Sequence, residues 1–258
     1  MTILVFDIET IPDIASGKKL YQLDDLDDTD TAHALFAMRR AKTGHEFLPH
    51  HLHKIVAISL VMSHKRQLKV WSLGHEDADE KELIERFFTG LAKHKPTLVS
   101  WNGSGFDLPV LHYRALLHGV AAPAYWEIGE NEQGFRWNNY LNRYHYRHLD
   151  LMDVLAGYQA RSCAPLDEIA SMLGFPGKMG MHGAKVWDAY QAGDIQGIRD
   201  YCETDVLNTY CVYLRFELMR GNLLATEYQN ALKELRDYLG RESDKMHLQE
   251  FLQQLQQV

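Results

Sequence analysis

The sequence contains little cysteine and little proline, and it has no long apolar run. Its 258 residues include three cysteines and seven prolines. Because Cys163, Cys202 and Cys211 show no paired spacing, we expect reduced thiols, as in a cytoplasmic protein, rather than a disulfide framework. No apolar run is long enough to span a membrane. The first apolar run begins almost at the first residue, so we also expect no signal peptide.

An excess of positive charge is also missing. Lysine and arginine number 27 against 35 acidic residues, so the formal net charge is −8 at pH 7. This is the wrong sign for a protein that grips duplex nucleic acid over its whole surface. The acidic bias is partly local, because five aspartates fall within residues 24–30. Any binding of a polyanion would therefore need a restricted basic path.

Two carboxylates follow a predicted buried strand. The near-continuous apolar run at residues 3–6 is typical of a strand buried on both faces. Because strand side chains alternate, Asp7 and Glu9 should point to one side while Ile8 points into the core. Such a pair repels itself unless a cation lies between, and Mg²⁺ and Mn²⁺ prefer oxygen ligands. A strand running out into solvent explains the pair equally simply.

A third carboxylate stands at a predicted strand–turn–helix junction. Residues 97–101 predict a short strand, 102–105 a turn and 108–118 a helix. Asp107 occupies the expected N-cap position, with Pro109 tolerated in the first helical turn. It is either a helix cap or a further metal ligand at the end of the sheet.

A tyrosine and an aspartate share one face of a predicted helix over residues 194–220. Tyr201 and Asp205 are four residues apart, which places a phenol beside a carboxylate. Asp205 could complete a metal site while the Tyr201 hydroxyl orients a water molecule. Glu203 falls on another face and is predicted to be solvated. A core tyrosine beside a surface aspartate is the alternative interpretation.

Taken in order, the motifs D-x-E, N-x-x-x-F-D and Y-x-x-x-D resemble those of the DEDD superfamily of 3′–5′ exonucleases. The tyrosine resembles that of the DEDDy branch, since the sister branch would have a histidine at the position of Asp200. Within the superfamily the chain is similar to the exonuclease domain of family B DNA polymerases, in its stand-alone form, the PolB-like predicted 3′–5′ exonuclease. The likeness runs from the first motif to Asp205 and includes residues 148–155 and 185–194.

The resemblance implies a ribonuclease H-like α/β fold, in which helices flank a central mixed sheet. The sequence agrees, because it predicts strands at 54–62 and 67–73 joined by a turn at 64–66, a helix over 80–93 and a strand near 148–151. We expect a single exonuclease domain over residues 1–258. It would carry an acidic and then helical insertion at about 12–53 (helix 31–42) and a C-terminal helical extension at about 222–258 (helices 224–239 and 246–255).

The resemblance also implies the site and its metals. It predicts two divalent ions, Mg²⁺ or Mn²⁺, with Asp7 bridging both, Glu9 and Asp205 on the ion that carries the nucleophile, and Asp107 on the other. Tyr201 would orient the attacking water, because an unperturbed tyrosine is a poor base at neutral pH. The implied catalytic residues are therefore Asp7, Glu9, Asp107, Tyr201 and Asp205, and the implied substrate-binding residues are Ile8, Thr10, Asn102, Gly103 and Phe106.

The expected activity is hydrolysis of single-stranded DNA from its 3′ end by a two-metal mechanism, releasing nucleoside 5′-monophosphates. RNA or oligoribonucleotides remain alternative substrates, because no motif reports on contacts to the 2′-hydroxyl. A non-catalytic nucleic-acid-binding or polymerase-accessory module is the alternative of another class, although all four acids and the tyrosine are present. The resemblance suggests replication or repair proteins as partners.

Three other segments leave alternatives open. Residues 135–148 interleave arginines with aromatic residues, which suits either a path for a single strand or a hairpin packing its rings on the core. Residues 174–183 are glycine-rich but lack a P-loop ending, and we predict a mobile connection with Lys178 and Lys185 as candidate nucleic-acid contacts. His45, His50, His51 and His53 match no zinc pattern.

Overall fold

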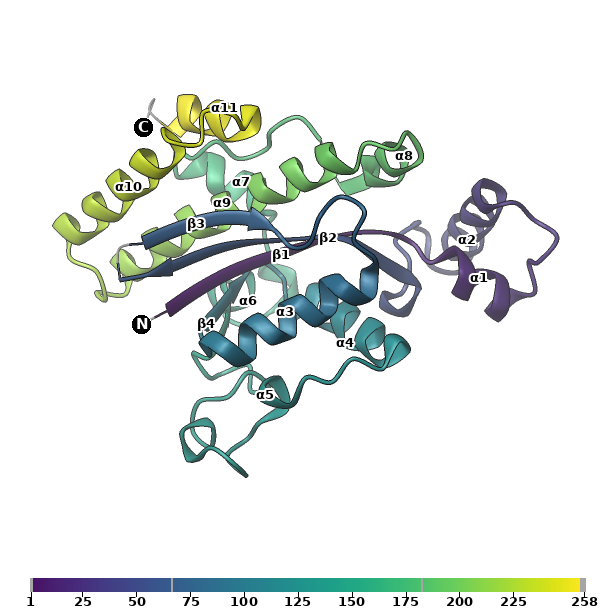
Figure 1. Ribbon diagram of the computed structural model, residues 1–258, viewed down its shortest axis with the longest axis horizontal. Helices are drawn as coiled ribbons and strands as arrows, with labels where there is room; N and C mark the ends of the chain where they lie inside the picture. The colour runs from purple at the N-terminus through teal and green to yellow at the C-terminus, as the bar shows by residue number, and fades with distance from the viewer. Residues whose placement is uncertain (1, 66, 182, 256–258) are drawn as a thin grey trace.

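The computed structural model describes residues 2–65, 67–181 and 183–255. Within these ranges a mixed sheet with strand order β3-β2-β1-β4-β5 lies between two layers of helices, as predicted (Figure 1). The pairs β1–β2 and β2–β3 are antiparallel, and β1–β4 and β4–β5 are parallel. The strands are β1 (Thr2–Pro12), β2 (His53–His64), β3 (Gln67–Ser72), β4 (Thr97–Ser100) and β5 (His148–Asp150). Arg66, in the predicted turn between β2 and β3, lies outside the described residues.

Strand β1 is longer than its apolar run predicts. It continues to Pro12 because β2 pairs with it along its whole length, with a register shift after Glu9. The parallel neighbour β4 pairs with β1 only as far as Val5. Asp7 and Glu9 therefore lie inside β1 rather than at its end. Along this part of β1 the edge away from β2 is not paired with β4, so other elements can approach it.

Two helical layers bury opposite faces of the sheet. Leu4, Phe6 and Ile8 of β1 pack in one cluster with residues of α3 (Glu80–His94) and α4 (Asp107–His118). On the other face, Val5 packs in a cluster that includes residues of three long helices. These are α9 (Ile195–Met219), α10 (Ala225–Leu239) and α11 (Met246–Leu255), and all three match predicted helices. No described helix combines the length and the apolar character that crossing a membrane requires.

The insertion contains two helices more than the sequence predicts, one α-helix and one short 3₁₀ helix. It consists of α1 (Ile14–Tyr21), α2 (Asp28–Thr43) and the short helix η1 (His50–Leu52), and α1 and α2 extend beyond the end of β1 (Figure 1). A buried network of charged side chains anchors the start of the insertion. Arg114 of α4 pairs with Asp13 and donates a 2.7 Å hydrogen bond to Glu80 of α3.

The aromatic and basic segment at residues 135–148 is not a hairpin, because its only strand is β5 at the end. Phe135 and Tyr140 are buried, whereas Trp137, Tyr144 and Tyr146 are exposed. The segment thus packs some rings on the core and presents others to solvent. The remaining short helices are α5 (Pro123–Trp126), η2 (Gln133–Phe135), α6 (Leu151–Leu155), η3 (Ala160–Ser162), α7 (Leu166–Met172), η4 (Gly183–Lys185) and α8 (Val186–Gln191).

Candidate active site

Strand β1 directs two carboxylates toward helix α9. The alternation of side chains places Ile8 in the cluster beneath the sheet and leaves Asp7 and Glu9 on the opposite face. Cys202 of α9 lies against them, with its Sγ 3.5 Å from both the backbone oxygen and Oδ2 of Asp7. One potential ligand atom from each of Asp7, Glu9 and Cys202 falls within 4.8 Å of the others. Among the described residues this is the one group of metal-binding side chains so closely spaced, and it includes none of the four clustered histidines.

Asp107 reaches the same place from helix α4. It is the first residue of the helix, and Phe106 holds the N-cap position without a side-chain hydrogen bond, so the predicted N-cap is wrong by one residue. The carboxylate is free to accept a hydrogen bond from the backbone N–H of Ile8, at 3.1 Å. This bond is available because the pairing of β1 with β4 has already ended.

The loop before Asp107 is tightly held. Asn102 adopts a left-handed backbone with φ of 63°, and a Cβ added at Gly103 would collide with the side chain of Ser100. The Asp150 carboxylate accepts hydrogen bonds from the backbone N–H groups of Asn102, at 2.9 Å, and Ser104, at 2.8 Å. The loop therefore sets the position from which α4 begins.

Helix α9 supplies Tyr201 and Asp205 one turn apart, and the Tyr201 hydroxyl donates toward the Asp205 carboxylate. Glu203, predicted to be solvated, is instead buried at 4% exposure. It accepts hydrogen bonds from Ser72, at 3.0 Å, and Lys245, at 3.3 Å, and it contacts His247 at 2.9 Å. The prediction is wrong because α11 docks against this face of α9.

Burial raises the pKa of all four carboxyl groups, and repulsion among them adds to the shift for Asp7 and Glu9. Burial, followed by the charges of Asp107, Glu9 and Asp205, raises the pKa of Asp7 well above its usual value. The pKa of Glu9 is also well raised, first by burial and then by Asp205 and Asp107. Burial raises the pKa of Asp107 to about 7 and that of Asp205 to about 6. A cluster of buried carboxylates that repel one another fits hard divalent cations such as Mg²⁺ or Mn²⁺.

Two further side chains interact with this cluster of carboxylates. Burial, and then the charges of Asp205 and Glu9, raises the pKa of Tyr201 far above its usual value of 10. Lys178, in the glycine-rich segment, lies near enough to lower the pKa of Asp205. That segment includes His182, which is outside the described residues.

A cavity of about 620 Å³ adjoins Glu9. Three of the predicted substrate-binding residues, Ile8, Thr10 and Phe106, line it. Asn102 instead lines a separate cavity of about 460 Å³, and Gly103 lines neither. The sequence did not predict the other walls, which come from the insertion (His33, Phe36, Glu46, Phe47, Leu48 and His53) and from the region of α8 (Gly183, Trp187 and Asp188).

Aromatic rings make one wall of this cavity. The rings of Phe47, His53 and Phe106 contact one another, with centroids 5.0–5.3 Å apart. Burial lowers the pKa of His53 to about 4, so its ring is neutral, and its Nδ1 lies 2.8 Å from the hydroxyl of Thr10. The Nε1 of Trp187 is buried and has no hydrogen-bond partner among the described residues. This cavity therefore offers flat apolar surface, to which the Trp187 side chain contributes although its Nε1 is buried.

Comparison with known proteins agrees with the resemblance that the sequence motifs show. The family described as "Predicted 3'-5' exonuclease related to the exonuclease domain of PolB" matches residues 45–255. The catalytic polypeptide of DNA polymerase epsilon from Emericella nidulans is 28% identical over 145 residues, which are 54% of this chain and 6% of that protein. Its counterpart in Dictyostelium discoideum is 34% identical over 67 residues, or 26% of this chain and 3% of that protein. The chain thus matches only a small part of these relatives' length.

A solved structure shares the fold. The family B DNA polymerase of the archaeon Pyrobaculum calidifontis superposes on 98% of this chain with a TM-score of 0.52 and 16% sequence identity. The chain covers 27% of that polymerase. The likeness bears out the ribonuclease H-like fold that the motifs predict.

Proposed function

Because this chain belongs to the family of predicted 3′–5′ exonucleases related to the exonuclease domain of PolB, we propose that it is a metal-dependent 3′–5′ exonuclease. Its substrate would be single-stranded nucleic acid, with DNA preferred. The observation that carries the proposal is the meeting of Asp7, Glu9, Asp107 and Asp205, from one strand and two helices, beside an aromatic cavity.

The four carboxylates would hold two divalent ions, Mg²⁺ or Mn²⁺. Bound there, the ions supply an activated water and stabilise the leaving 3′ oxygen. The protein contributes rigidity, because β1 fixes Asp7 and Glu9 while the Ile8 N–H fixes Asp107. Asp205 is placed by α9 and oriented by Tyr201.

Tyr201 would orient the attacking water rather than remove its proton. Because its pKa is raised above its usual value, its hydroxyl stays protonated at neutral pH. A neutral hydroxyl next to Asp205 can hold a water molecule by one hydrogen bond while donating another. The products would be nucleoside 5′-monophosphates.

The cavity beside Glu9 would receive the 3′-terminal nucleoside. Bases stack on aromatic rings irrespective of sequence, and Phe47 and Phe106 offer such rings. The Trp187 side chain, which also lines the cavity, would add to this apolar surface. A base inserted into a cavity of this kind cannot remain paired, which supports a single-stranded substrate.

The preference for DNA is supported by the polymerases among the relatives, and it suggests replication or repair proteins as partners. An RNA or oligoribonucleotide exonuclease is the second candidate, because the cavity walls that would meet a 2′-hydroxyl include polar side chains such as Thr10 and His33.

The test uses a 5′-labelled single-stranded DNA and an RNA of the same sequence, each with Mg²⁺, Mn²⁺ or EDTA. We expect a ladder that shortens from the 3′ end, faster for DNA, abolished by EDTA and by Asp7→Ala. Binding of both strands without cleavage by the folded wild-type protein would favour the non-catalytic module instead.

A further inference from the structure

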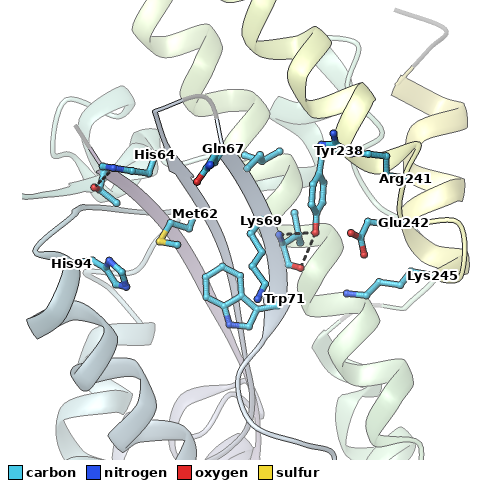
Figure 2. A pocket seen from close by; sticks show the side chains of 13 residues that line it. Met62, His64, Gln67, Lys69, Trp71, His94, Tyr238, Arg241, Glu242 and Lys245 are labelled. Carbon is cyan, nitrogen blue, oxygen red and sulfur yellow. Dashed lines mark hydrogen bonds between the residues drawn. The ribbon is translucent and has the colours of Figure 1, made fainter.

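A third cavity, of about 940 Å³, lies near the start of β1, where Thr2 lines it. Figure 2 shows the side chains around it. Side chains of β2, β3, the end of α3 and the region after α10 line it. We call it the basic groove and define it by Lys69, Trp71, His94, Arg241, Glu242 and Lys245. We propose that the basic groove binds the sugar–phosphate backbone of the strand whose 3′ end occupies the active site. This inference rests on the proposed function.

The first argument for this proposal is the charge of the groove. On a protein with a net charge of −8, its lining contains two lysines, one arginine and two histidines against a single acid, Glu242. Lys69 and Arg241 are exposed, and neither forms an ion pair within the described part of the chain. Free cations of this kind are available to phosphates.

Two of the three arginines of residues 135–148 are less available, whereas the third, Arg136, is exposed and lies 5.5 Å from the centre of the exposed Trp137 ring. Arg143 is paired with Asp153 at 2.8 Å. Arg147 donates to the backbone oxygens of Asn138, at 3.1 Å, and Lys95, at 3.0 Å. A polyanion would have to compete for these groups, so the basic groove is the better surface for a phosphate backbone.

An aromatic ring stands among the free cations. The ammonium group of Lys69 lies 5.1 Å from the centre of the Trp71 ring, which is half-buried in the groove wall. A ring beside cations is the combination that holds single strands, because bases stack on the ring while cations meet phosphates.

The groove does not suit an extended peptide added to the sheet. β3 is the edge strand, but the Tyr238 hydroxyl occupies its backbone at Val70 (Figure 2). It accepts from the Val70 N–H at 3.0 Å and donates to the Val70 carbonyl at 3.2 Å. Further along, Arg199 donates to the carbonyl of Leu73 at 3.0 Å. With the edge closed, strand addition is blocked, and the groove's charge and ring favour nucleic acid.

The separation from the active site gives the proposal a length scale. Thr2 lines the groove, and Asp7 follows it by five residues on β1, or roughly 17 Å of strand. The odd spacing places the two side chains on opposite faces of the sheet, so a nucleic-acid strand that joins the groove to the carboxylates passes around the edge strand β3. At about 3.4 Å per stacked nucleotide this path takes at least roughly five nucleotides. A trinucleotide would reach only the active site, whereas a 20-mer would reach both.

The test compares Lys69→Glu/Arg241→Glu with wild type. Lys19→Glu/Lys42→Glu is the matched control, since it makes the same change in net charge at exposed lysines outside both cavities. The neutral pair Lys69→Gln/Arg241→Gln serves if the charge reversal fails to fold. Binding of a 5′-fluorescein single-stranded 20-mer is measured by anisotropy in EDTA, and KM is measured with metal for the 20-mer and for a trinucleotide.

We expect the groove variant to bind the 20-mer about tenfold more weakly, with a log–log salt dependence shallower by about 1.4 for two lost phosphate contacts. The KM for the 20-mer should rise by about the same factor, while kcat and the trinucleotide KM stay unchanged. Equal losses in the control pair, or equal losses on both substrates, would overturn the proposal. So would displacement of the 20-mer by a 20-residue polyglutamate at equal charge concentration, which would indicate an acidic protein partner.

The two hypotheses fail separately. If wild type hydrolyses neither substrate but the groove variant still loses binding of the 20-mer, the exonuclease is rejected and the groove is kept. If wild type hydrolyses both and the groove variant binds normally, the groove is rejected and the exonuclease is kept.

Discussion

The backbone N–H of Ile8 donates a 3.1 Å hydrogen bond to Oδ1 of Asp107, and this bond fixes helix α4 to strand β1 between the two carboxylates of that strand. Because residues 7 and 9 flank Ile8, the Asp107 side chain stands beside both. The same bond that positions the ligand therefore holds like charges together in a buried place. The Ile8–Asp107 hydrogen bond thus both positions the Asp107 carboxylate and brings its charge close to Asp7 and Glu9. A mutation that keeps the hydrogen bond but removes the charge separates the two effects.

Asp107→Asn should stabilise the metal-free protein at neutral and alkaline pH. The amide keeps an acceptor oxygen for the Ile8 N–H but removes a charge. The pKa of Asp107 is raised from 3.8 to about 7 in the folded state, so ionisation costs stability increasingly from about pH 4, and the cost is complete above pH 7. In EDTA at pH 8 we expect a gain on the order of 2–4 kcal/mol, vanishing near pH 4.

Urea unfolding at both pH values measures this effect, with exposed Asp77→Asn as the control. Saturating Mg²⁺ should reverse the order, because only the wild type keeps the complete ligand set. A wild type more stable than Asp107→Asn in EDTA at pH 8 would mean that the buried charge of Asp107 does not destabilise the metal-free protein.

Tyr201→Phe should lower kcat with little change in KM. Loss of one hydrogen bond that orients the attacking water should reduce kcat by about ten- to a hundredfold. Because the pKa of Tyr201 is raised, the hydroxyl is not ionised below pH 10, and the alkaline limb of the pH–rate profile should be the same in variant and wild type. Tyr213→Phe, on the same helix, is the control. Disappearance of an alkaline limb in Tyr201→Phe would show that the tyrosine acts as a base.

Trp187→Phe should weaken binding of a nucleoside 5′-monophosphate by about three- to tenfold, because the smaller ring leaves less apolar surface in the cavity that Trp187 lines. Calorimetric titration with Mn²⁺ present measures this without any hydrolysis. Trp137→Phe is the matched control, because Trp137 is 79% exposed and lines neither cavity. Equal affinities for the two variants would remove Trp187 from the nucleoside site.

His247→Gln should make the docking of α11 independent of pH between 6 and 10. Burial alone would lower the pKa of His247, but hydrogen bonds with Asp200 and Glu203, and their charges, raise it to about 9. A pKa raised above the unfolded value of 6.5 contributes stability that is complete below pH 6.5 and is lost as the pH rises through 9. Lys245 also faces Glu203, at 3.3 Å.

We therefore expect wild type to exceed His247→Gln by about 2–3 kcal/mol at pH 6 and by almost nothing at pH 10. Urea unfolding at the two pH values measures the difference, with His45→Gln, an exposed residue, as the control. A difference that grows with pH would contradict the assignment of charge to His247.

The periodicity of the sequence predicted those structural features that depend only on residues close together in the chain. Alternation in β1 placed Asp7 and Glu9 on one face, and the four-residue spacing placed Tyr201 beside Asp205. The predicted helices at the C-terminus also agree with α10 and α11. These features need no knowledge of distant partners.

Long-range packing decided the rest. β1 extends past its apolar run because β2 pairs with it, and Glu203 is buried because residues more than 40 positions later dock on α9. The cavity beside Glu9 is closed by Phe47 and Trp187, which no periodicity links to the motifs. The aromatic and histidine content of the insertion was the only signal for that wall.

The most direct test of the account identifies the first product. A single-stranded DNA whose 3′-terminal nucleoside occurs nowhere else in the strand is incubated with the protein and Mn²⁺, and the released material is identified by mass spectrometry. The account predicts that the 5′-monophosphate of that terminal nucleoside appears first, and that it is absent with EDTA or Asp7→Asn. Release of a 5′-terminal nucleotide, an internal fragment or a nucleoside 3′-monophosphate first, or of the same product from Asp7→Asn at the wild-type rate, would contradict it.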